Sequence, residues 1–89
     1  IGRITTVHFT PHYLRSFARL TKILRELQGE RENIFRVNPF DPRLNTHKLK
    51  GRLAGLWSYS VDRKHRVLFR FIEGDLVIFY DIGPHDIYQ

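Results

Sequence analysis

Three strand-like segments lie close together in the second half of the chain, and they constrain the fold more than any other feature. Residues 57–61 alternate apolar side chains with serines, as a half-buried strand does. Residues 66–72 and 76–82 follow after short polar turns. Turns of this length join antiparallel neighbours, so the three segments are predicted to form a meander. The last segment is nearly all apolar, which indicates a central strand covered on at least one face.

The first half of the chain predicts one strand and two helices. Residues 3–9 are rich in β-branched side chains, which favour a strand. Thr10-Pro11 is typical of a helix start, because the hydroxyl can cap the helix and proline lacks an N–H that the first turn would leave unpaired. A helix is expected over residues 11–20, and Thr21 starts a second one that continues to about residue 37. The predicted fold is α+β, in the order β-α-α-β-β-β, with two N-terminal helices packed on a small antiparallel sheet.

The length of the chain limits it to one domain, residues 1–89. A chain of this size buries only about 60–65% of its unfolded surface, so it supports a single core. Hydrophobic residues make up 42% of the sequence and aromatic residues 13%, which is enough to build that core. No apolar run approaches the roughly 18–20 residues that span a bilayer. With no visible signal peptide and no cysteine, the sequence predicts a cytoplasmic protein with no membrane partner.

Positive charge is concentrated in the middle of the chain. Residues 43–70 carry eight Lys or Arg residues against the single acid Asp62, whereas residues 71–89 carry four acids and no Lys or Arg. The net charge of the chain is +6. A surface with this charge suits a polyanionic partner such as RNA.

Metal-independent cleavage of RNA needs a base for the ribose 2′-OH, an acid for the leaving 5′-oxygen and cations on the phosphate. Histidine suits both proton transfers, and Lys and Arg suit the phosphate. Candidate side chains gather in three segments of the chain: His47, Lys48 and Lys50; Lys64, His65 and Arg66; and His85 with Tyr88.

Topology predicts which of these segments meet. In an antiparallel meander the start of the middle strand lies beside the end of the last one, so Arg66 and His85 are expected at the same end of the sheet. His47 precedes a strand that begins at the opposite end, and it reaches them only through a long strand or a loop that folds back. If residues 47–50 are extended, Lys48 and Lys50 lie on one side and His47 on the other.

The five histidines carry no recognised zinc motif with matching carboxylates, so no metal site is predicted, and no cofactor motif is present.

Several motifs taken in order resemble one family. They are VHFTPHYLRSF (7–17), NPFDPRLNTHKLKGRLAGLWSYSV (38–61), HRVLF (65–69) and DIGPHDIY (81–88). Together they resemble the RelE/ParE superfamily of type II toxins, and most closely its YafQ/YoeB-like mRNA interferases. The resemblance implies an RNA site on the concave, basic face of the sheet. It also implies attack of a 2′-OH on the adjacent phosphate, which leaves a 2′,3′-cyclic or 3′-phosphate and a 5′-hydroxyl.

The resemblance also implies roles for single residues. Arg66 stands where YoeB-like toxins hold a phosphate-binding arginine, and His85 stands on their C-terminal catalytic histidine. Tyr88 lies near their terminal aromatic residue, and His47 matches a functional histidine of YafQ-like members. Further contacts with RNA are expected from the basic residues Lys48, Lys50 and Lys64 and from Trp57, since Trp57 or Tyr88 could stack on a base.

The sequence departs from each relative at one point. YoeB-like toxins place a glutamate base ahead of the G-x-W-S motif, but no acid lies between Asp41 and Asp62 here. The base is therefore either His47 or a lysine with a lowered pKa. YafQ-like toxins have Asp-Trp where this chain has His65-Arg66.

The expected function is a ribosome-dependent endoribonuclease that cuts mRNA in the ribosomal A site and pairs with a cognate antitoxin protein. Two alternatives remain open at this stage: a ParE-like inhibitor of DNA gyrase without nuclease activity, and a catalytically inactive RNA-binding or scaffolding relative.

Overall fold

Two helices and five strands follow one another in nearly the predicted order. The computed structural model describes residues 2–88, with the side chains of residues 2–86. The elements are β1 (Thr6–Phe9), α1 (Pro11–Ala18), α2 (Lys22–Val37), β2 (His47–Lys48), β3 (Trp57–Ser60), β4 (His65–Glu73) and β5 (Leu76–Pro84). Short 3₁₀ turns lie at Pro42–Leu44, Gly51–Leu53 and His85–Tyr88.

The strands form one sheet in the order β1-β5-β4-β3-β2. The meander β3-β4-β5 is antiparallel, as predicted, and the α+β class is confirmed. The sheet differs from the prediction in two respects. It is mixed, because β1 pairs in parallel with β5. The two helices that follow β1 return the chain to the end of the sheet at which β1 begins. It also gains a fifth strand, the short β2, which pairs antiparallel with β3.

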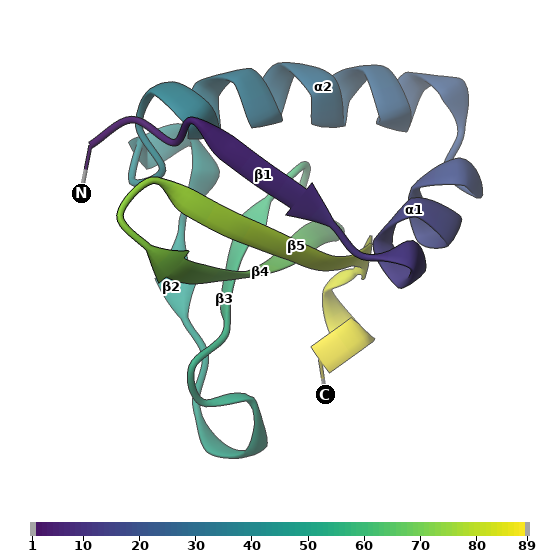
Figure 1. Ribbon diagram of the computed structural model, residues 1–89. Coiled ribbons are helices and arrows are strands. Elements are labelled where there is room, and N and C mark those ends of the chain that lie inside the picture. Colours follow the sequence, from purple (N-terminus) through teal and green to yellow (C-terminus); the bar gives the residue numbers. More distant parts are fainter. Residues whose placement is uncertain (1, 89) are drawn as a thin grey trace.

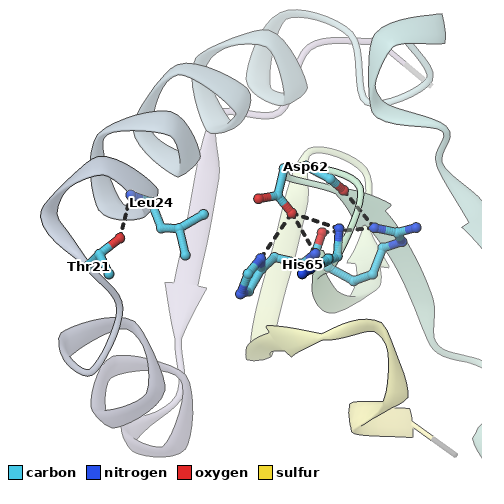
Figure 2. Close-up of polar contacts among 6 residues, drawn as sticks. Thr21, Leu24, Asp62 and His65 are labelled. Carbon is cyan, nitrogen blue, oxygen red and sulfur yellow. Dashed lines mark hydrogen bonds and ion pairs between the residues drawn. The ribbon is translucent and has the colours of Figure 1, made fainter.

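Hydroxyl caps start both helices, as the sequence indicates. The Oγ1 of Thr10 accepts from the N–H of Tyr13 at 3.0 Å and donates to the carbonyl of Tyr80 at 3.0 Å, which ties α1 to β5. Thr21 caps α2 by accepting from the N–H of Leu24 at 3.2 Å (Figure 2). The helix α2 continues unbroken through Gly29.

Aromatic rings from α2 and three strands form the centre of the core. Phe35 of α2 is fully buried and stacks on Tyr59 with 5.0 Å between ring centroids. It meets Phe69 and Phe79 edge-on at 4.9 and 5.6 Å. Figure 1 shows α2 running along one side of the sheet, while no helix covers the other side. One face of β3, β4 and β5 is therefore core, and the opposite face is free for a site.

A buried hydrogen-bond chain links α1, α2 and β3. Gln28 donates from Nε2 to the Tyr13 hydroxyl at 3.0 Å, and the Tyr59 hydroxyl donates to Gln28 Oε1 at 2.9 Å. All three side chains are at most 2% exposed. Burial raises the pKa of both tyrosines well above its ordinary value, so their hydroxyls stay protonated.

We expect Gln28→Leu to lower the free energy of unfolding by about 1–3 kcal/mol, because it leaves two buried hydroxyls without their partner. Urea denaturation measures the change. Asn33→Leu, on an exposed position of the same helix, is the control and should stay within about 0.5 kcal/mol of wild type. Equal stability of the two variants would show that the hydrogen-bond chain contributes nothing.

Candidate active site

The face of the sheet opposite the helices carries two of the predicted site residues, His47 and Arg66. Strand alternation sends Tyr59, Val67 and Phe69 into the core, so their neighbours point the other way. We call this surface the helix-free face; it comprises His47, Ser58, Ser60, Arg66, Leu68, Arg70 and Asp81. Figure 1 shows the loop after β2 and the C-terminal turn extending away from the sheet on this side, opposite α2.

Arg66 and His85 lie at the same end of the sheet, as the topology predicts. Arg66 pairs with Ser60 on β3 and with Gly83 on β5. His65 pairs with Pro84, and the backbone N–H of His85 donates to the carbonyl of Lys64 at 2.6 Å. The His85 side chain is exposed on the closing turn. Its position is therefore tied to the strand that carries Arg66.

Asp62 closes the hairpin between β3 and β4 (Figure 2). Its Oδ1 accepts from the N–H groups of Lys64 and His65 at 2.9 and 2.7 Å and lies 2.9 Å from His65 Nδ1. Partial burial raises the pKa of Asp62, but the hydrogen bonds from His65 and Lys64 outweigh it and lower the pKa overall.

The same hairpin holds the arginine. Arg66 Nη1 donates to the carbonyls of Asp62 and His65 at 2.7 and 3.1 Å. Among the described residues no carboxylate is paired with Arg66 in an ion pair. Its positive charge is therefore held in place without being neutralised by a contact.

His47 reaches the helix-free face because the loop after it folds back. The chain makes the short strand β2, turns through Gly51–Leu53 and returns as β3, so that His47 lies opposite Ser58. Its Nδ1 lies 3.0 Å from the carbonyl of Asn45, and its Nε2 lies 3.4 Å from Ser58 Oγ. Strand spacing and rise place the Cα atoms of His47 and Arg66 roughly 12 Å apart.

The other predicted residues lie in four different places. Lys64 lies in the hairpin turn beside Arg66, and Lys50 is exposed at the start of the folded-back loop. Lys48 lies opposite Trp57, which packs against Phe40 and Phe71 on the core side of the sheet. Lys48 and Trp57 therefore point away from His47. The side chain of Tyr88 lies outside the described residues.

Three further arginines, which were not predicted as site residues, lie around Arg66. A hollow of about 290 Å³ at the end of β3 is lined by four arginines, with Asn45, Ser60 and Asp62. The arginines are Arg31, Arg43, Arg63 and Arg66. Arg43 pairs with Asp41 through two hydrogen bonds, and this contact lowers the pKa of Asp41 to about 2. Arg31 comes from α2, so only the tertiary fold reveals this grouping.

Arg70 also lies on the helix-free face, but it was not predicted as a site residue. The signal was present in the sequence, since Arg66, Leu68 and Arg70 share one side of a strand by period two.

Within residues 2–88 the histidines and carboxylates form no group of three or more that could hold a metal ion. No helix of this part of the chain combines the length and apolar character needed to cross a membrane.

Comparison with known proteins identifies the fold. No family model matches the sequence, and no curated protein matches it. A YoeB/ParE toxin from Agrobacterium tumefaciens superposes with a TM-score of 0.76 at 20% identity, covering 91% of this chain and 99% of that one. The RelE–RelB complex from Pyrococcus horikoshii gives 0.74 at 16% identity, with 92% and 96% covered. A RelBE toxin–antitoxin complex from Mycobacterium tuberculosis gives 0.71 at 22% identity, with 93% of each chain covered. The chain therefore has the fold of the RelE and YoeB toxins.

We expect Asp62→Ala to lower the free energy of unfolding by about 1–2 kcal/mol near pH 7, because three hydrogen bonds to one carboxylate oxygen are lost. The pKa of Asp62 is lower in the folded chain, so its contribution is present above the unfolded value of about 3.9 and is lost as the pH falls through the folded value. Urea titrations at several pH values should therefore show the variant and wild type converging in acid. Glu30→Ala, on an exposed helix position, is the control. A deficit that does not shrink in acid would contradict this role.

Proposed function

We propose that the chain is the toxin of a type II toxin–antitoxin system and acts as a metal-independent endoribonuclease on mRNA. The observation that carries the proposal is the placement of Arg66 and His85 at one end of the sheet, with His47 on the same face as Arg66. The likeness of the fold to RelE and YoeB toxins supports it.

The chemistry begins with a proton transfer. The base removes the proton of a ribose 2′-OH, and the 2′-oxygen attacks the adjacent phosphorus. The bond from phosphorus to the 5′-oxygen breaks, and an acid protonates that oxygen as it leaves. The products are a 2′,3′-cyclic phosphate and a 5′-hydroxyl, so atoms and charge balance without a metal.

His47 is the proposed base. It shares the helix-free face with Arg66, whereas Lys48 points to the other side of the sheet. The contact of Nδ1 with the carbonyl of Asn45 favours a proton on Nδ1, which leaves Nε2 to accept one. Ser58 is fully buried, and its Oγ lies 3.4 Å from Nε2, within reach of a hydrogen bond to that nitrogen.

Arg66 is the proposed phosphate ligand. Its guanidinium is anchored through Nη1 to the hairpin carbonyls, and the remaining N–H groups can face the phosphate. Arg31 and Arg63, which line the 290 Å³ hollow and form no ion pair among the described residues, add positive potential. A preorganised cation stabilises the charge that builds on the phosphate oxygens in the transition state.

His85 is the proposed acid. It follows β5 directly, is exposed to solvent, and is held next to β4 by its backbone bond to Lys64. In sheet order Arg66 lies between His47 and His85, so base and acid flank the phosphate. Tyr88, close to His85 in sequence, keeps its proposed role of stacking on a base.

The proposed substrate is mRNA in the ribosomal A site, and the proposed partner is an antitoxin. The net charge of +6 suits both RNA and an acidic antitoxin segment. Solved structures of the same fold include a RelBE toxin–antitoxin complex and a RelE–RelB complex.

We expect His85→Ala, Arg66→Ala and His47→Ala each to lower the single-turnover rate of RNA cleavage by about 10²–10⁴-fold, the usual contribution of one positioned acid, base or charge. Circular dichroism should show an unchanged fold. His8→Ala, an exposed histidine on β1, is the matched control and should cut at the wild-type rate. Wild-type rates in the His85 and Arg66 variants would overturn the proposed site.

The antitoxin proposal predicts a complex. The product of an adjacent small reading frame, co-expressed with this chain, should co-purify with it and restore growth of the host. An antitoxin from an unrelated locus is the control. A toxic chain that co-purifies with neither product would contradict the partner assignment.

A further inference from the structure

A second hollow on the helix-free face takes no part in the chemistry described above. It has a volume of about 630 Å³ and lies between the folded-back loop, the middle of β4 and β5, and the start of α1. Arg52 and Arg70 line it together with Leu56, Leu68, Tyr80 and Asp81.

The two arginines of this hollow carry unneutralised charge. Arg52 comes from the 3₁₀ turn of the loop, and Arg70 comes from β4. Among the described side chains, neither makes an ion pair with a carboxylate. The one acid in the hollow, Asp81, contacts His12 at 3.2 Å and accepts from the N–H of Ile82 at 2.8 Å. The hollow therefore offers two cations to an incoming anion.

The folded-back loop lies close to the Arg70 side chain at Gly55. Gly55 has a φ of +95°, and a Cβ at that position would lie 3.0 Å from Nη2 of Arg70. A side chain there would be strained by the backbone and would push against the guanidinium. The glycine thus lets the loop backbone approach Arg70 and close one side of the hollow.

The remaining walls suit a base. Leu56 and Leu68 supply apolar surface, and Tyr80 adds an aromatic side chain. Tyr80 has no partner in the ladder between β4 and β5, because Leu68 pairs with Asp81 and Phe69 with Phe79. Such a bulge re-aims the side chain of the extra residue. Cations beside apolar and aromatic walls match a nucleotide, which has a charged phosphate and a flat base.

The hollow lies along the same strand as the proposed reaction centre. Arg66 and Arg70 are four residues apart on β4, which places their Cα atoms about 13 Å apart. One phosphate cannot contact both. We propose that the Arg52–Arg70 hollow binds a second nucleotide of a single-stranded RNA, whose scissile phosphate lies at Arg66. This inference rests on the proposed function and extends it to a stretch of RNA beyond the cut.

Binding of a labelled 2′-O-methyl RNA hexanucleotide, which cannot be cut, tests the inference. We expect Arg70→Gln and Arg52→Gln each to weaken binding roughly tenfold or more, the effect of losing one charged hydrogen-bonded contact. The slope of log Kd against log salt should fall by about 0.7 for each lost phosphate contact. Arg70→Lys should retain most of the slope because it keeps the charge. Lys22→Gln, exposed on α2, is the control and should bind like wild type.

Cleavage of unmodified RNA by the same proteins separates this inference from the proposed function. If Arg52→Gln and Arg70→Gln fold, and bind the hexanucleotide with wild-type affinity and slope, the inference is overturned even when wild type cuts RNA through His85. If both variants lose binding but wild type never cuts RNA, the nucleotide site stands and the nuclease assignment falls. If Arg70→Gln fails to fold, Arg52→Gln alone decides, because its side chain is exposed on a loop.

Discussion

Burial of one face of the meander under Phe35 determines what the other face presents. Tyr59, Phe69 and Phe79 surround that ring and fix the register of β3, β4 and β5. A slip of one residue would exchange the two faces of a strand, exposing aromatic rings and burying Arg66. The hydrophobic core therefore sets the position of the basic residues, although it contacts none of the proposed chemistry. The Gln28 chain adds directional bonds to this packing and joins both helices to the sheet.

Much of the fold could be predicted because it depends on local signals. Alternation in β3, the short polar turns and the Thr caps at Thr10 and Thr21 all act within a few residues, and each is found in the structure. The placement of Arg66 and His85 at the same end of the sheet followed from the topology of the meander alone. The parallel pairing of β1 depends on where α1 and α2 return the chain, which no local pattern records. The position of His47 likewise depended on a loop whose course the sequence left open. Trp57 shows the limit of residue type as a guide, since its contacts with Phe40 and Phe71 place it on the core side.

The helix-free face divides into two regions along β4. At the hairpin end, Arg66 is anchored by backbone carbonyls between His47 and His85, an arrangement suited to charge development on one phosphate. Four residues further on, Arg52 and Arg70 line a larger hollow with apolar walls. Both regions hold arginines that no described carboxylate neutralises.

The most direct test of nuclease function is primer extension on a defined messenger in a reconstituted bacterial translation reaction, with and without ribosomes. Cuts at codon-phased positions that need ribosomes, and that carry 5′-hydroxyl ends, are the predicted result. Cuts that form equally well without ribosomes would support the nuclease activity but contradict cleavage in the ribosomal A site. A folded, toxic protein that makes no cuts in either reaction would contradict the proposal and favour inhibition of DNA gyrase.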